Sequence, residues 1–464
     1  MNTTSHEQKI ILWVVGMALF IETLDATILN TAIPTLAKAL HTTIFHTGLA
    51  LTSYLLSLAI FIPISGWLAE KYGAQKIFLL GLFLFTLGSI CCGLSRTLSF
   101  LVISRIIQGF GGSIMMPVAR IILIKSFSKS QLIDAINAAT LPAIAGPMLG
   151  PFVGGFIVSY MSWRWIFFIN IPFCLAGLYL AWKYIKNHKN SHTVPLNFLN
   201  FSLFSLGLAS LLIVLEMISH HAYLEYFAYA SLTTFFLFVC FYIHYKLTGT
   251  TIVAFSLFKI RTFSLTAMGS FISRVAFGGI PFLLPILFQV TLGKSPLISG
   301  LLILPLALGM FVGKLVIKKL LHLLGYKYLL CCNCLIYALT VAQYIFIGST
   351  TPALLICLMV FLNGMSQLFL FTCFNSLAYT DLDDTQINKA TSIMGMIQYI
   401  GMGAGIIFTS VVISLLFPGT NINQSSTIPL KIIHQTFFII SCMFSLSLLI
   451  FSFLKKEDGS SSYQ

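Results

Sequence analysis

Long apolar segments follow one another along almost the whole chain, each long enough to cross a lipid bilayer. A membrane-spanning helix needs about 20 mostly apolar residues. Because 58% of the 464 residues are hydrophobic and 8% are charged, a soluble globular domain is excluded and an all-α polytopic membrane protein is predicted. About fourteen spans meet the length criterion. They cover residues 10–32, 47–68, 77–95, 98–124, 136–158, 165–185, 196–216, 226–246, 262–290, 298–320, 327–348, 352–378, 391–417 and 433–454.

The basic residues lie mainly in alternate loops between these segments. If the N-terminus is cytoplasmic, 18 of the 26 lysines and arginines fall on the cytoplasmic side, five fall outside and three lie within spans. Basic residues favour cytoplasmic loops, so we expect both termini in the cytoplasm. The net charge of +14 is therefore a sign of topology. It predicts a lipid bilayer as partner and no nucleic acid.

The first span contains two carboxylates, Glu22 and Asp25, three residues apart. A charged side chain at the centre of a bilayer costs about 2.5–3.5 kcal/mol on insertion scales. A chain that keeps two of them in one span is expected to use them. They predict a proton or cation site in a transport path.

A six-span unit is predicted to occur twice. The loop from Gly66 to Lys76 is similar to the stretch from Gly313 to Lys327, and Gln108-Gly109 corresponds to Asn363-Gly364. Parallel repeats of this kind place a substrate site near mid-membrane, between the halves. The predicted domains are a six-helix bundle over 1–190, two extra linker helices over 191–250 and a second six-helix bundle over 251–464.

Five stretches form a set of motifs. They are Leu24 to Pro34, Gly66 to Lys76, Arg105 to Gly112, the series Gly146, Gly150-Pro151, Gly154-Gly155, and Trp163 to Pro172. Together they resemble the major facilitator superfamily, in particular its 14-span drug:proton antiporter branch and the MdtD-like and HsrA-like bacterial exporters within it. The second stretch departs from the family's motif at two places. Glu70 replaces the usual Asp, and Ala74-Gln75 occupies a position that is commonly basic.

The resemblance implies two six-helix bundles plus two extra helices, in a multi-pass protein of the bacterial inner membrane. It also implies that Gly66, Glu70, Gly73 and Lys76 belong to a conformational latch, for which the alternative is a solvated turn. The glycines and Pro151 of the fourth motif would form a kinked, closely packed helix that limits proton leak and favours antiport. Simple helix packing is the alternative, since small residues let helices approach closely.

Asp25 and Arg105 can meet if the two spans that carry them are neighbours, as the resemblance implies. At 1.5 Å per residue, Asp25 lies about 22 Å from the cytoplasmic end of its span, and Arg105 about 20 Å from the same face. Burial disfavours the charged carboxylate and a nearby guanidinium favours it, which suits a group that loads and releases a proton. Our hypothesis is that Asp25 carries the coupling proton, Arg105 tunes it, and Glu22 lies on the same face. A static buried pair that positions two helices is the alternative.

Arg274 lies about 18 Å into its span, also near mid-depth. It is expected to pair with the acids across a cavity, to contact an anionic substrate, or to have a structural role. Other candidates for the substrate cavity are amides in or near the spans, which would otherwise hydrogen-bond between helices. They are Gln108, Asn137, Gln289, Asn363 and Gln398.

The leading functional prediction is proton-driven export of small amphipathic compounds by alternating access, as in multidrug efflux. The alternative is export of a polar metabolite or a metal chelate, such as a citrate-type or siderophore-type anion. Import by proton symport is a third possibility, which the Gly150-Pro151 pattern disfavours. The expected partners are a small-molecule substrate and protons. A periplasmic or outer-membrane partner protein is an open question.

Other classes of function lack their motifs. No phosphate-binding Gly-Lys-Ser/Thr loop occurs, which argues against ATP-driven transport. Neither His-Glu-x-x-His nor Gly-x-Ser-x-Gly occurs, so we expect no enzymatic activity, no cofactor and no metal site. A membrane sensor would need a sizeable soluble domain, and no segment of the sequence is polar enough over such a length.

Overall fold

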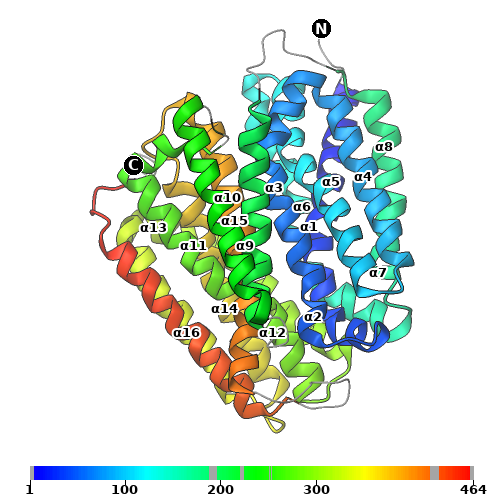
Figure 1. Cartoon of the computed structure of the whole chain (residues 1–464), viewed down its shortest axis with the longest axis vertical. Helices are drawn as coiled ribbons and strands as arrows, with labels where there is room; N and C mark the ends of the chain where they lie inside the picture. Colours follow the sequence, from blue (N-terminus) through cyan, green and yellow to red (C-terminus); the bar gives the residue numbers. More distant parts are fainter. Residues whose placement is uncertain are drawn as a thin grey trace. The chain divides into compact units, whose positions relative to one another are not determined.

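The computed structural model in Figure 1 describes residues 5–187, 196–219, 224–249, 251, 253–417 and 428–459. Within these ranges the regular structure is helical and contains no strand. Thirteen helices of the described part are long and apolar enough to cross a membrane. The predicted all-α membrane fold is confirmed.

One of the thirteen helices is long enough for two spans. The segment Pro296–Phe346 has 51 residues, about 77 Å of helix, whereas the apolar core of a bilayer is about 30 Å thick. Its helical path breaks at Gly325, where φ is 68° and ψ is 171°. The two parts correspond to the predicted spans 298–320 and 327–348. Counted separately, they bring the thirteen helices into agreement with the predicted number of about fourteen spans.

The chain forms two compact units, Met1–Ser202 and Leu203–Gln464. Unit 1 contains α1 (Ser5–Ala39), α2 (Ile44–Thr47), α3 (Leu49–Tyr72), α4 (Ala74–Leu94), α5 (Leu98–Ser126), α6 (Lys129–Tyr160), α7 (Trp165–Phe168) and α8 (Asn170–Tyr184). The boundary between the units falls within α9 (Phe198–Ser219). The predicted division at 190/191 and 250/251 falls at or beside residues outside the described ranges and stays a prediction.

Unit 2 contains the rest of α9 and the helices that follow it. They are α10 (Leu224–Thr248), η2 (Phe255–Lys259), α11 (Arg261–Gly278), α12 (Ile280–Pro285), η3 (Ile286–Thr291), α13 (Pro296–Ala342), η4 (Gln343–Phe346), α14 (Ala353–Leu377), α15 (Asp384–Leu416) and α16 (Leu430–Ser452). The predicted span over 262–290 corresponds to a single candidate span, Arg261–Thr291, which consists of α11, α12 and the π-helical turn η3. Pro281 and Pro285 lie in this segment, and each removes a backbone donor from the helical ladder.

Helix α1 is at the centre of the packing in unit 1. It packs most extensively against α6, and it also contacts α5 and α8. Helix α4 packs against α5 and α8, and these helices run side by side in Figure 1. The acids of α1 are therefore surrounded by side chains from several helices. In unit 2, α11 packs on α15 and α16, while α13 packs on α14 and α16.

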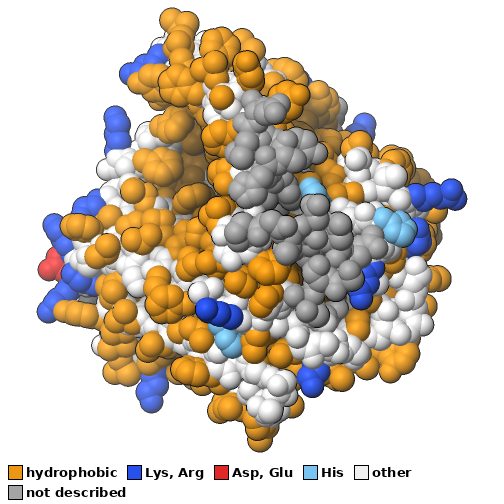
Figure 2. Space-filling view, turned by 60° about the horizontal axis from the view of Figure 1, so that its bottom comes forward, with side chains coloured by type: hydrophobic (Ala, Val, Ile, Leu, Met, Phe, Trp, Pro, Cys, Tyr) orange, Lys and Arg blue, Asp and Glu red, His pale blue; other side chains and the backbone are white. Residues whose placement is uncertain are grey.

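Large hydrophobic side chains cover much of the exposed surface. Trp13 in unit 1 is 70% exposed and Leu354 in unit 2 is 83% exposed. Figure 2 shows one face, on which hydrophobic side chains are widespread and lysines and arginines stand as separate groups. Such a surface is unfavourable in water and matches a lipid environment.

Two turns support the predicted repeat. Gly73 between α3 and α4 has φ 100°, and Gly325 within α13 has φ 68°. Each glycine follows a helix within one of the two similar stretches. Each has a positive φ, which favours a residue without a Cβ atom. In addition, Gly109 of α5 lies against the Tyr54 carbonyl of α3, as Gly364 of α14 lies against Leu306 of α13. The corresponding glycines thus make corresponding helix contacts in the two units.

Candidate functional site

Asp25 and Arg105 form a buried ion pair in unit 1. The Arg105 Nη1 atom lies 2.5 Å from Asp25 Oδ2, and neither side chain is exposed. The prediction that the two residues can meet is therefore confirmed. Removing one partner of such a pair costs about 3–5 kcal/mol because the other charge stays buried alone.

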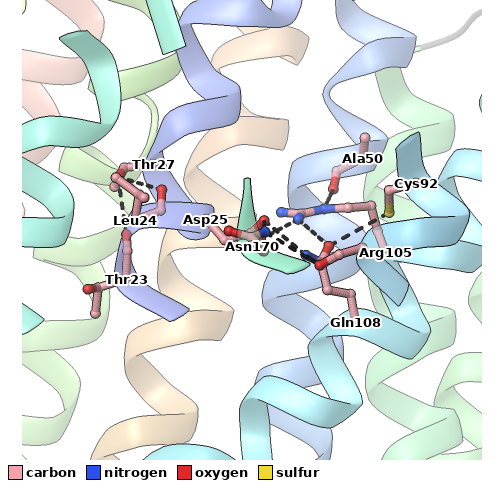
Figure 3. Close-up of polar contacts among 10 residues, drawn as sticks. Thr23, Leu24, Asp25, Thr27, Ala50, Cys92, Arg105, Gln108 and Asn170 are labelled. Carbon is pink, nitrogen blue, oxygen red and sulfur yellow. Dashed lines mark hydrogen bonds and ion pairs between the residues drawn. The ribbon is translucent and has the colours of Figure 1, made fainter. Parts of the chain in front are cut away.

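Two amides complete the hydrogen bonding of the Asp25 carboxylate (Figure 3). Gln108 Nε2 donates to Asp25 Oδ1 at 2.9 Å, and Asn170 Nδ2 donates to the same oxygen at 2.8 Å. The Gln108 side chain also accepts a 2.6 Å hydrogen bond from Arg105 Nη1 through its Oε1 atom. Hydrogen bonds to an ionised group are roughly twice as strong as neutral ones, so this set stabilises the carboxylate.

Arg105 has partners besides Asp25. Its Nε atom donates to the Ala50 carbonyl at 3.0 Å, and its guanidinium lies 4.1 Å from the centre of the Tyr54 ring. Both residues belong to α3. Stacking on an aromatic face stabilises a cation by about 0.5–2 kcal/mol. The arginine would therefore keep several interactions if Asp25 became neutral.

Helix α4 contributes the outer part of the network. Ser89 Oγ accepts hydrogen bonds from Gln108 Nε2 at 2.9 Å and from Asn170 Nδ2 at 3.4 Å. Cys92 Sγ lies 3.7 Å from Gln108 Oε1. With these contacts, one polar network joins α1, α3, α4, α5 and α8 in the interior of unit 1.

Glu22 lies one turn before Asp25 but has a different environment. It is 3% exposed, and its Oε2 atom has no hydrogen-bond partner among the described residues. Gly112 of α5 is a neighbour of this side chain, since a methyl group there would come 3.7 Å from Glu22 Cγ. A buried carboxylate oxygen without a partner makes the charged form costly. The two acids of α1 therefore differ, because both oxygens of Asp25 accept hydrogen bonds whereas Oε2 of Glu22 does not.

The glycines of α6 press against the part of α1 that carries Asp25. A methyl group on Gly146 would come 2.7 Å from the Leu24 nitrogen, and one on Gly150 would come 3.1 Å from the Ile28 nitrogen. Gly154 lies directly against the Ile28 carbonyl, and Gly155 is buried. Thr31 of α1 donates to the Pro151 carbonyl at 3.1 Å. Close packing by this motif fits both of its predicted roles; the seal against proton leak stays a prediction.

The junction of α3 and α4, with the first turn of α4, is hydrogen-bonded to the end of α8. Gln75, which stands where a basic residue is common, donates to the Trp182 carbonyl at 2.9 Å and the Ala181 carbonyl at 3.3 Å. Gly73 lies directly against the Asn187 side chain. A Cβ atom at Gly66 would meet no neighbour, and the side chains of Glu70 and Lys76 are exposed. The latch role of Glu70 and Lys76 stays a prediction.

The amides predicted for the substrate cavity lie in different places. Gln108 belongs to the Asp25 network. Asn363 is buried between α13 and α14, where its Nδ2 donates to Thr340 Oγ1 at 3.1 Å. The side chain of Asn137 is exposed, whereas those of Gln289 and Gln398 are partly buried. Their contact with a substrate stays a prediction.

Several members of the network were not identified as site residues from the sequence. Ser89, Tyr54 and the Ala50 carbonyl have no sequence signal of their own in an apolar span. Asn170 does lie within the motif from Trp163 to Pro172, and its amide at the start of α8 was the available signal. Its proximity to Asp25, 145 positions earlier in the chain, follows from tertiary packing.

Comparison with known proteins identifies the class. The sequence matches the profile of the Major Facilitator Superfamily over residues 15–406. The chain therefore belongs to the Major Facilitator Superfamily, and it is a multi-pass membrane transporter rather than an enzyme.

Named relatives agree over most of the chain. HsrA of Haemophilus influenzae, named as a probable transport protein, is 34% identical over 416 residues, which are 89% of this chain and 90% of HsrA. MdtD of Salmonella heidelberg, named as a candidate multidrug resistance protein, is 33% identical over 444 residues, which are 95% and 94% of the two chains. The resemblance to MdtD-like and HsrA-like proteins is confirmed.

Solved structures agree in fold. A D-xylose–proton symporter matches with a TM-score of 0.67 and 15% identity, over 97% of this chain and 98% of the symporter. A bacterial homologue of the lysosomal transporter Spinster matches with a TM-score of 0.67 and 14% identity, over 97% of each chain. At such identities the likeness concerns the fold alone.

Proposed function

We propose that this transporter is a proton-coupled antiporter that exports small amphipathic compounds from the cytoplasm by alternating access. The observation that carries the proposal is the buried pair of Asp25 and Arg105 within a network that joins five helices. Export is supported by the similarity to MdtD, whose name refers to multidrug resistance. A bacterial inner membrane location with both termini in the cytoplasm belongs to the same proposal and is supported by the distribution of basic residues.

Asp25 is the proposed proton carrier. When its carboxylate takes up a proton, Arg105 loses its counter-charge but keeps the Ala50 carbonyl, the Gln108 oxygen and the Tyr54 ring. Gln108 and Asn170 lose a charged acceptor, so the hydrogen bonding of α1 to α5 and α8 weakens. A proton thus favours one packing of these helices over another, which is what a coupled transport cycle requires. Glu22, one turn away and with no partner for its Oε2 atom among the described residues, is the proposed second proton site.

Transport by inverted membrane vesicles tests the proposal. Vesicles are energised to an acidic interior, and a fluorescent pH probe follows proton release on addition of ethidium, 1-naphthoate or citrate. We expect wild-type protein to move at least one compound in exchange for protons. We expect Asp25→Asn to reduce this exchange about tenfold or more, because the ion pair that senses the proton is gone. Glu457→Gln, the same chemical change at an exposed carboxylate, serves as the matched control and should behave as wild type.

A neutral double variant separates coupling from a static role of the pair. Replacing both partners of a buried ion pair is often nearly neutral for stability. We therefore expect Asp25→Asn with Arg105→Gln to fold better than either single variant but to remain uncoupled. Proton-linked transport by the double variant at the wild-type rate would mean that the pair only positions α1 and α5, and the proposal would be wrong.

A further inference from the structure

Arg274 of unit 2 is a buried cation that has no ion pair with any of the described residues. It lies on α11 and its side chain is fully buried. None of its three guanidinium nitrogens, Nε, Nη1 and Nη2, has a hydrogen-bond partner among the described residues. Arg105 provides the contrast within the same chain, since its Nε and Nη1 atoms bind a carbonyl, an amide and a carboxylate. A charge buried in this way costs several kcal/mol unless something pairs with it.

The neighbours of Arg274 are aromatic. The guanidinium lies 5.4 Å from the centre of the Phe371 ring and 5.9 Å from that of Phe374, both on α14. A methyl group built on Gly401 of α15 would come 2.8 Å from Arg274 Cβ. The base of the Arg274 side chain is therefore closely packed against α15. Aromatic faces attract a cation but do not accept the in-plane N–H groups of a guanidinium as a carboxylate does. The donors of Arg274 thus remain available to a ligand.

We propose that Arg274 binds the anionic group of the transported compound and that the substrates are amphipathic organic anions, with a carboxylate on an aromatic or aliphatic body. This inference rests on the proposed transport function and specifies its substrate class. A guanidinium presents two parallel N–H donors that match a carboxylate. Phe371 and Phe374 form an apolar wall for the body of the compound, as ligand sites usually combine apolar walls with few polar groups. Because Arg274 is closed off here, the anion reaches it in another conformation of the cycle.

Binding to the purified full-length protein tests the charge of the ligand directly. Three probes share one ring system and differ in charge: 1-naphthoate, 1-naphthalenemethanol and 1-naphthylmethylammonium. Calorimetric titration should give 1-naphthoate an affinity at least about tenfold higher than either analogue, because only the carboxylate pairs with the buried guanidinium. Equal binding of the neutral or cationic probe, or no binding of any probe, would overturn the proposal.

Variants of Arg274 test the residue. We expect Arg274→Gln to lower the affinity for 1-naphthoate about tenfold or more and to leave the neutral probe unaffected. Arg274→Lys should keep part of the preference because the charge remains. Arg261→Gln, which removes a half-exposed arginine from the start of the same helix, is the matched control. Unchanged 1-naphthoate binding in a folded Arg274→Gln protein would show the inference to be wrong. If both Arg274 variants unfold, the charge preference of the wild type decides.

The test distinguishes this inference from the proposed function. In the Asp25→Asn variant we expect proton coupling to be lost while 1-naphthoate still binds through Arg274. Coupled transport retained in Asp25→Asn would contradict the proton role of Asp25. Binding retained in Arg274→Gln would contradict the anion site alone.

Discussion

Gly150 of α6 lies directly against Thr27 of α1. A methyl group on Gly150 would come 2.9 Å from Thr27 Cβ and still closer to the Thr27 hydroxyl oxygen. Thr27 is two residues after Asp25, and its hydroxyl donates to the carbonyls of Thr23 and Leu24 on its own helix, as Figure 3 shows. The glycine motif and the segment of α1 that contains Asp25 are therefore in direct contact, and this close packing depends on the absence of a side chain at Gly150.

Gly150→Ala should lower the stability of the purified protein by about 1–3 kcal/mol, because the added methyl group pushes α1 away from α6. Adding Thr27→Ala should restore part of the loss, since it removes the hydroxyl nearest the methyl group. Thermal unfolding in detergent, together with proton-coupled transport, measures both effects.

Gly154→Ala provides the control, because its methyl group would meet the Ile28 carbonyl, a backbone atom that no side-chain substitution removes. Thr27→Ala should not rescue it. Equal rescue of both glycine variants by Thr27→Ala would contradict the contact described here.

Asn170→Leu should destabilise the protein by about 1.5–3 kcal/mol, the usual contribution of a hydrogen bond to a charged group. Asn170→Asp should be more damaging at pH 8 than at pH 5.5, because a second carboxylate then faces Asp25 and the repulsion is relieved when one of them takes up a proton. Thermal unfolding at the two pH values checks this. A pH-independent effect of Asn170→Asp would mean that its side chain does not face Asp25.

Gly325→Ala should cost about 1–3 kcal/mol, because its backbone at φ 68° and ψ 171° is in a region that residues with a Cβ atom avoid. Gly348→Ala is the matched control, since Gly348 has no positive φ and no atom within 4 Å of a built Cβ. Chemical or thermal unfolding of the two variants should differ by this amount. Equal stability of both would argue against a break of α13 at Gly325.

The sequence by itself determined the membrane class, the number of spans, the family and the identity of the charged residues at mid-depth. These properties are local. A run of about 20 apolar residues is set by the thickness of the bilayer, and a charge inside such a run is conspicuous wherever the helix packs. For the same reason the sequence indicated Asp25 and Arg105, whose depths depend only on their distance from the span ends.

The tertiary structure decided which side chains share a site. Asn170 and Ser89 hold the Asp25 network although they lie 145 and 64 positions from Asp25 in the chain. Gln108, expected at a substrate cavity, joins the same network, whereas Arg274 has aromatic neighbours and no acid among the described residues around it. These outcomes depend on how each helix is rotated about its axis and which helices are adjacent. Hydropathy carries little of that information, since contacts between distant segments form only when the bundle packs.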